Sequence, residues 1–250
     1  MIINRFFLPI AAAALSVMTP IAAQAAQFII TYSGTVNGRD KTGAFGAPNT
    51  DFINSAFTAI YLLDTSTVGA TTRTDNLTLS HIFGGTNSNT VSPVSASLTI
   101  NGFTRAFNGL ADGAAILVNN DTGTGADIID LRVSDIGLSA TSTTSNYMYH
   151  TVDDAAGTFL SSVIWGPAFT YAASQNDGTS AYFQFSTRNN ATGLDEEYAN
   201  GLMNIESITV ASVGAIPEPA TWLLMIVGFG MVGASIRSKR RQSSGVVAAA

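Results

Sequence analysis

The sequence of 250 residues contains no cysteine, and only 11% of its residues are charged. The absence of cysteine excludes disulfide bonds, thiolate metal sites and a cysteine nucleophile. Strong helix formers are also few between the two ends of the chain. Thr, Val, Ile, Phe and Tyr recur there instead, which favours β structure.

Positive charge is scarce in the middle of the chain. Between the two apolar ends, six Lys and Arg stand against sixteen Asp and Glu, a net charge of −10. A segment with this charge repels phosphate backbones, so a nucleic acid is not an expected partner. The same acidity keeps a protein soluble, and this simpler interpretation needs no partner.

The N-terminal segment has the layout of a secretory signal. Arg5 precedes the apolar run Phe6–Val17, and Ala23 and Ala25 are the small residues that signal peptidase accepts. We therefore predict that residues 1–25 direct the chain to the Sec machinery and are then removed by signal peptidase. The alternative is an N-terminal membrane anchor, but the apolar run is too short to span a bilayer.

A second apolar run, Trp222–Ile236, contains no charged residue and is followed by the basic cluster of Arg237, Lys239, Arg240 and Arg241. As a helix, residues 220–236 reach the lower edge of the length that spans a membrane. The basic cluster is expected to stay in the cytoplasm, which places the preceding domain outside. A buried core helix is the alternative, but the basic cluster directly behind the run argues against it.

The tripeptide Pro217-Glu218-Pro219 precedes this run, and Trp222 follows after two further residues. With the apolar run and the basic cluster, residues 217–242 resemble the PEP-CTERM sorting signal of Gram-negative bacteria. The resemblance implies recognition by an exosortase, a membrane enzyme thought to process its substrates near Pro-Glu-Pro. The two prolines suit this role because they hold Glu218 in an extended, accessible segment. A permanent single-span anchor is the alternative.

Residues 26–213 are predicted to form one antiparallel β-sandwich of the jelly-roll or immunoglobulin type. The clearest pattern lies in Pro93–Phe107, where alternating apolar residues lead into Asn101-Gly102, the preferred pair for a type I′ hairpin turn. Asp153–Ile164 reads as a short helix or a further strand. The other expected strands are Gln27–Val36, Ser55–Leu63, Asn76–Phe83, Ala114–Val118, Ile128–Val133, Asn146–Thr151, Ala181–Arg188 and Ile205–Val213.

The opening of this domain is similar to that of many β-rich proteins that carry the same tail. The resemblance implies the fold and the cellular context, and no activity. The matching residues are Gly34, Gly43, Phe45, Gly46, Phe57 and Asp64.

Few residues indicate catalysis or metal binding. The two histidines, His81 and His150, are far apart in the sequence, and a lone histidine in a strand is usually structural. The stretch Asn119–Asp130 resembles a calcium loop, but Arg132 stands where the bidentate Glu of an EF-hand belongs. A different calcium site on a loop stays open. We predict no catalytic residue, no metal and no cofactor.

Two groups of acidic residues are candidates for the paired carboxylates of glycoside hydrolysis. A set of aromatic residues is a candidate for stacking on sugars. Solvated turns explain the acidic residues more simply, and core packing explains most of the aromatic ones. The acidic groups are Asp153-Asp154 and Asp195-Glu196-Glu197. The aromatic residues are Tyr147, Tyr149, Trp165, Tyr171 and Tyr182.

The leading hypothesis is an exported protein that is held in the inner membrane by its C-terminal helix. After processing it reaches the cell surface or the extracellular matrix. Its ectodomain is expected to be structural or adhesive and not an enzyme. A glycan-binding module is the first alternative, and a hydrolase of extracellular polysaccharide is the second.

Overall fold

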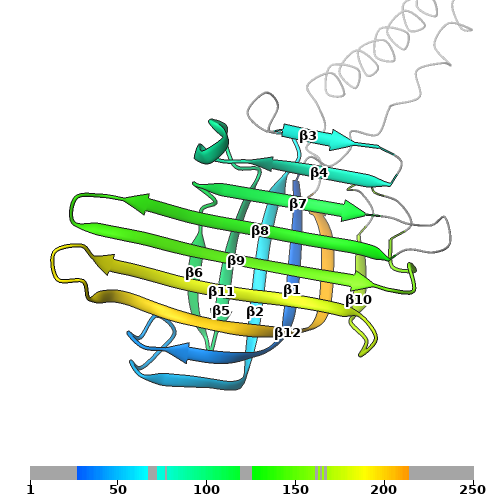
Figure 1. Ribbon diagram of the computed structural model, residues 1–250. Coiled ribbons are helices and arrows are strands. Elements are labelled where there is room, and N and C mark those ends of the chain that lie inside the picture. Colours follow the sequence, from blue (N-terminus) through cyan, green and yellow to red (C-terminus); the bar gives the residue numbers. More distant parts are fainter. Residues whose placement is uncertain are drawn as a thin grey trace, which may run out of the picture. The chain divides into compact units, whose positions relative to one another are not determined.

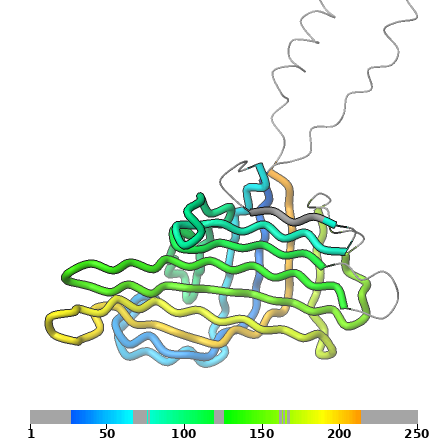
Figure 2. The backbone as a smooth tube through the Cα atoms, turned by 45° about the horizontal axis from the view of Figure 1, so that its top comes forward, coloured from blue at the N-terminus to red at the C-terminus, as the bar shows by residue number. Residues whose placement is uncertain are grey.

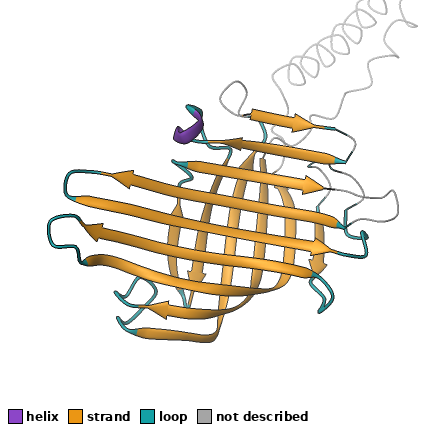
Figure 3. Cartoon of the chain, in the orientation of Figure 1, coloured by secondary structure: helices purple, strands orange, loops and turns teal. Residues whose placement is uncertain are grey.

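The computed structural model describes residues 27–66, 72–76, 78–118, 126–160, 163, 165 and 168–213. This part of the chain is almost entirely β-strand, with one three-residue helix, η1, at Thr86–Ser88 (Figure 3). None of its helices has the length and apolarity needed to cross a membrane. The strands are β1 Gln27–Asp40, β2 Thr50–Asp64, β3 Thr72–Asp75, β4 Leu79–Gly84, β5 Val94–Ile100, β6 Phe103–Phe107, β7 Asp112–Val118, β8 Asp127–Leu138, β9 Ser142–Asp154, β10 Phe169–Ala172, β11 Gly178–Asn189 and β12 Asp195–Val213.

The described strands form one continuous antiparallel sheet, in the order β3-β4-β7-β8-β9-β11-β12-β1-β2-β5-β6, and β10 pairs with β12 beside this path. The prediction of a mainly β, antiparallel fold is confirmed. The predicted sandwich of two separate sheets is corrected, because a single sheet curls over on itself. Figure 1 shows the resulting two layers, with β4, β7, β8 and β9 running crosswise to β5 and the adjoining part of β2, and Figure 2 shows the same layers from another side.

The curl depends on the three longest strands, β1, β2 and β12, which bend and take part in both layers (Figure 1). Strands that pass from one layer to the other usually do so at a bulge. The pairing of β1 with β12 shifts register between Ser33 and Gly34. A Cβ atom at Gly34 would lie 2.0 Å from the carbonyl oxygen of Asn204. Only glycine therefore allows the two backbones to approach so closely at the bend.

Most of the strands expected from the sequence are confirmed. The Asn101-Gly102 turn has positive φ at both residues, 53° and 82°, as a type I′ turn requires, and it joins β5 to β6. The interpretation of Asp153–Ile164 is corrected, because β9 ends at Asp154 and residues 155–160 form a turn followed by irregular backbone. β3, η1 and β10 were not predicted from the sequence, and all three are four residues long or shorter.

Alternating apolar side chains from both layers fill the space between them. In β5, every second residue from Val94 to Ile100 is buried. The fully buried aromatic rings include Tyr32, Phe52 and Phe183. Burial of this apolar surface is the main driving force for a fold without disulfides.

The loop between β1 and β2 closes one side of this core. The buried carboxylate of Asp40 accepts hydrogen bonds from the backbone N–H groups of Gly43, Ala44 and Phe45, at 2.7, 2.9 and 2.6 Å. Gly43 has a φ of 92°, which favours glycine. These bonds turn the Phe45 ring inward, where it is 1% exposed and lies 5.5 Å from the Phe183 ring.

Candidate functional site

An open groove of about 440 Å³ lies on the outward face of the layer formed by β4, β7, β8 and β9. Its walls combine aromatic rings with a few polar groups, as in many ligand sites. It is lined by His81, Phe83, Asp112, Gly113, Ala114, Arg132, Val133, Ser134, Tyr147, Met148 and Tyr149.

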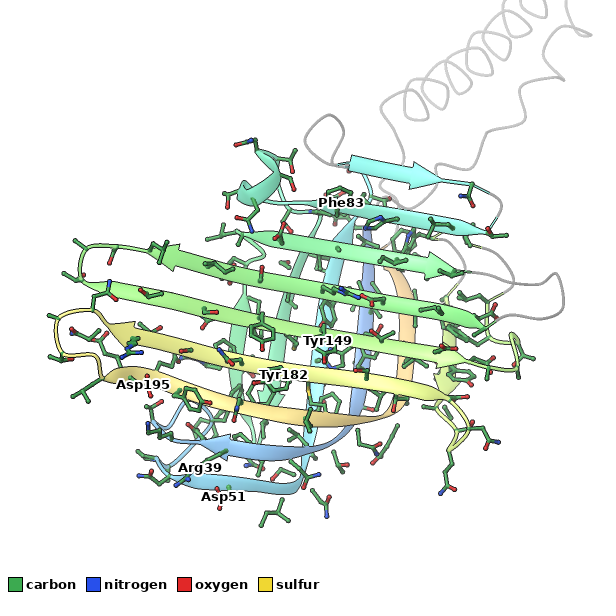
Figure 4. The ribbon with its side chains drawn as sticks, viewed as in Figure 1. Arg39, Asp51, Phe83, Tyr149, Tyr182 and Asp195 are labelled. Carbon is green, nitrogen blue, oxygen red and sulfur yellow. The ribbon has the colours of Figure 1, made fainter. Side chains whose placement is uncertain are left out.

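Antiparallel pairing brings the groove residues into one row across the strands. Phe83 of β4 is opposite Ala114 of β7, which is in turn opposite Arg132 of β8. Arg132 is opposite Tyr149 of β9, and Tyr149 is opposite Tyr182 of β11. Figure 4 shows Phe83, Tyr149 and Tyr182 following one another across the sheet. Residues up to 99 positions apart in the sequence therefore form one surface.

Three tyrosines from β9 and β11 form the centre of this surface. The ring centroids of Tyr147 and Tyr182 are 5.4 Å apart, and those of Tyr149 and Tyr182 are 6.4 Å apart. All three side chains are half-buried. Burial, followed by the hydrogen bond with Tyr182, raises the pKa of Tyr147 to about 12, so its hydroxyl stays protonated at neutral pH. The cluster thus offers aromatic faces together with hydroxyl groups.

Amide groups extend the tyrosine cluster along the sheet. The Tyr182 hydroxyl donates to Gln184 Oε1 at 3.2 Å and accepts from Asn200 Nδ2 at 3.3 Å. The same Asn200 nitrogen lies 3.2 Å from the Tyr198 hydroxyl. These neutral groups hold the tyrosine rings in place and present further donors and acceptors.

Arg132 is fixed in the groove by a buried carboxylate. Its Nε and Nη2 atoms donate to the two oxygens of Asp130 at 2.8 and 2.7 Å, and Thr151 also donates to Asp130, at 2.9 Å. The Asp130 side chain is only 6% exposed, whereas that of Arg132 is 62% exposed. The guanidinium is therefore held in a defined orientation, and its Nη1 atom has no partner among the described residues.

His81 and Phe83 form the wall on the β4 side of the groove, with ring centroids 4.9 Å apart. Partial burial is the largest effect on the pKa of His81 and lowers it. The charge of Asp130 raises this pKa and that of Arg132 lowers it, so the pKa lies below its ordinary value. The imidazole is therefore neutral at pH 7.

The structure separates the five predicted aromatic candidates into two groups. Tyr147, Tyr149 and Tyr182 lie together on the outward face, as described above. Trp165 is 5% exposed and packs against Phe28, with ring centroids 6.1 Å apart. Tyr171 packs on Phe159 at 4.9 Å and donates to Asp177 at 2.8 Å. Core packing therefore accounts for Trp165 and Tyr171, whereas Tyr147 and Tyr149 line the groove and Tyr182 lies beside them.

Asp153 and Asp154 do not form a catalytic pair, because successive side chains of a strand point to opposite faces. Asp154 is 2% exposed and accepts hydrogen bonds from the N–H groups of Ala156 and Thr158, at 3.0 and 2.7 Å. Burial raises the pKa of Asp154, but these bonds more than offset it and the pKa lies below its usual value. This carboxylate stabilises the turn after β9.

The second acidic group is also occupied by structural contacts. Asp195 pairs with Lys41 at 3.0 Å, and Glu197 forms an ion pair with Arg105. Glu196 accepts a hydrogen bond from Asn189 at 2.8 Å. Figure 4 shows Asp195 at the end of the sheet, away from Tyr149.

The two histidines lie in different environments. His81 is on the outward face, whereas His150 is fully buried between the layers. The Nδ1 atom of His150 is 2.8 Å from the Tyr61 hydroxyl, and its ring stacks on Tyr32 at 4.7 Å. Burial lowers the pKa of His150 to about 3. The interpretation of this histidine as a structural residue fits these contacts.

The calcium-like stretch Asn119–Asp130 is described only from residue 126 onward. There, the Asp127 carboxylate accepts the backbone N–H of Leu160 at 2.8 Å, and Asp130 holds Arg132. Within the ranges that the structure describes, no three His, Asp or Glu side chains gather in a way that would hold a metal ion.

Sequence reasoning did not identify Phe83, Asp130 or Arg132 as members of a site. The available signal was alternation, because each of these residues lies between buried neighbours on its strand. Alternation shows that such side chains face outward, but only the pairing register shows which of them meet.

The residues of the sorting and export signals lie outside the described residues. They are Ala23, Ala25, Pro217, Glu218, Pro219, Trp222, Arg237, Lys239, Arg240 and Arg241.

Searches of curated proteins and of solved structures found no match. A comparison with protein families matched residues 215–241 to the PEP-CTERM protein-sorting motif. This motif implies an exported protein that is sorted to the cell surface and processed by an exosortase. The chain therefore carries a PEP-CTERM protein-sorting motif at residues 215–241.

Proposed function

We propose that this protein is a non-enzymatic, polysaccharide-binding protein of the cell surface or extracellular matrix, and that its groove binds the glycan. Removal of residues 1–25 by signal peptidase and transient anchoring by a helix over residues 220–236 would deliver the ectodomain there. Exosortase processing near Pro217–Pro219 would then release it.

The observation that supports glycan binding is the grouping of Tyr147, Tyr149 and Tyr182 on an outward face, beside a fixed arginine. Half-buried tyrosines combine an apolar face with a polar edge, which suits the alternating C–H and hydroxyl surfaces of a sugar ring. The polar groups around them provide the few directional contacts that fix a ligand's orientation.

The hydrogen bonds that already occupy the carboxylates near the groove favour glycan binding over glycan hydrolysis. Glycoside hydrolases commonly place two carboxyl groups on either side of the bond to be cleaved. Asp130 lies beneath the groove and is covered by Arg132 and Thr151, and Asp112 in the groove accepts a hydrogen bond from Asn87 at 2.7 Å. Both carboxylates are therefore already engaged in fixing other side chains.

Replacement of Tyr149 and Tyr182 by Ala in the full chain should weaken binding to the producing bacterium's extracellular polysaccharide by at least about tenfold, because stacking area is lost. Co-sedimentation with the purified polysaccharide measures this. The matched control is Phe103→Ala, which removes an aromatic ring that is 52% exposed on β6. Equal binding by the double variant and the wild type would refute the proposal, and release of reducing sugar ends by the wild type would refute its non-enzymatic part.

A further inference from the structure

We propose that the ligand of the groove is a neutral glycan, bound as an extended chain that lies across the strands from Phe83 to Tyr182. This inference rests on the proposed glycan-binding function and specifies the class of glycan. It is carried by the charges of the groove and by the spacing of its aromatic rings.

The charge of the groove disfavours an acidic polysaccharide. Its lining includes one cationic residue, Arg132, and the Asp130 carboxylate neutralises that charge through two hydrogen bonds. Asp112 adds a negative charge at the rim, and His81 is neutral. The surrounding part of the chain, between the two apolar ends, carries a net charge of −10. Uronic acid, sulfate or pyruvate groups on a polymer would be repelled by this field.

The remaining polar groups suit the hydroxyls of neutral sugars. Arg132 presents its unpartnered Nη1 atom in a fixed orientation, because Asp130 holds the other side of the guanidinium. Gln184 and Asn200 add uncharged amides next to Tyr182. A hydroxyl group both donates and accepts hydrogen bonds, so it can use all of these partners without a charge of its own.

The distance between the aromatic side chains at the two ends of the row, Phe83 and Tyr182, indicates that the ligand is a chain of sugars and not a single sugar. From Phe83 to Tyr182 the row crosses four strand-to-strand steps, from β4 through β7, β8 and β9 to β11. Neighbouring strands are about 4.8 Å apart, so Phe83 and Tyr182 are roughly 19 Å apart along the row. One sugar ring covers one aromatic side chain at most. A ligand that touches both ends must therefore contain several sugars in an extended conformation.

The charge of the ligand is tested by separating the bacterium's extracellular polysaccharide into neutral and acidic fractions by anion exchange. Each fraction is then offered to the immobilised full chain. We expect capture of the neutral fraction, with an affinity that changes less than about twofold between roughly 0.05 and 0.5 M salt, because no ion pair forms. Capture of the acidic fraction alone would overturn this inference but leave the proposed function standing. Capture of neither fraction would overturn the proposed function itself.

The length of the ligand is tested with fragments of the captured glycan, sorted by size after partial hydrolysis. Affinity should rise with length and level off once a fragment reaches from Phe83 to Tyr182. Phe83→Ala should weaken binding of the long fragments about tenfold and leave the short ones unchanged, whereas Tyr182→Ala should weaken both. Circular dichroism confirms that both variants are folded. An affinity independent of length, or an equal loss for all fragments in Phe83→Ala, would refute the extended chain.

Discussion

Phe45→Ala should destabilise the folded domain by about 3–5 kcal/mol, the usual cost of removing a fully buried phenylalanine ring. The Phe45 ring is 1% exposed and contacts three other rings, those of Phe52, Phe183 and Phe185, at centroid distances of 6.0, 5.5 and 5.6 Å. The loop backbone is fixed by Asp40, so the cavity cannot close easily. Guanidinium unfolding of the full chain, followed by the fluorescence of the buried Trp165, measures the loss.

The control for this variant is Phe103→Ala, which removes the same atoms from a ring that is 52% exposed. Its effect should stay within about 0.5 kcal/mol, as for most surface substitutions. Equal losses in the two variants would mean that the loop between β1 and β2 does not close the core.

Acidification from pH 7 to pH 4.5 should remove about 2–3 kcal/mol of folding free energy through His150 alone. Burial lowers the pKa of His150 to about 3, while its value in the unfolded chain is about 6.5. Between the two pKa values, the unfolded state binds more protons than the folded state. The contribution of His150 to the free energy of unfolding is therefore fully present above about pH 6.5, and it falls by about 1.36 kcal/mol per pH unit as the pH drops toward 3.

The variant His150→Asn isolates this effect, because it cannot titrate and its side-chain amide can still form a hydrogen bond with the Tyr61 hydroxyl. It should be less stable than the wild type at pH 7 but lose about 2–3 kcal/mol less on acidification. The carboxylates whose pKa is lowered, such as Asp154, are present in both proteins, so their contributions cancel. Identical pH dependence of unfolding in the two proteins would show that His150 is not buried in its neutral form.

The β content of the fold followed from local features of the sequence. The Asn101-Gly102 pair specifies its own turn, and the alternation in Pro93–Phe107 specifies which side chains are buried. The curl of the sheet was not predicted. It depends on close approaches such as that of Gly34 to Asn204, which are 170 residues apart. A pattern read along one strand carries no information about a partner so distant in the sequence.

The resemblance at the start of the domain has a structural basis. Gly34 allows the bend of β1, Phe45 fills the core, and Gly43 and Gly46 have the positive φ values of a tight loop. The same holds for the remaining two matches: Phe57 is 3% exposed, and Asp64 accepts hydrogen bonds from the backbone and hydroxyl of Ser66. These six residues therefore have structural roles, and none of them lines the groove.

The candidate site was only partly predictable. Tyr147, Tyr149 and Tyr182 were among the candidate sugar-stacking residues because of their residue type. Phe83 and Arg132 were missed, because their membership depends on the pairing of β4, β7, β8 and β9. The alternative that Asp153 and Asp154 act as a catalytic pair finds no support, since adjacent residues of a strand face opposite sides.

The most direct test of the account is mass spectrometry of the protein's two ends after fractionation of intact cells, with and without the exosortase gene. We predict a surface or extracellular product that begins near Ala26 and lacks the sequence beyond Pro217–Pro219. Without the exosortase, the C-terminal segment should be retained and the protein should stay in the membrane fraction. An unprocessed chain of residues 1–250, dissolved in the cytoplasm of the wild-type cells, would contradict the account.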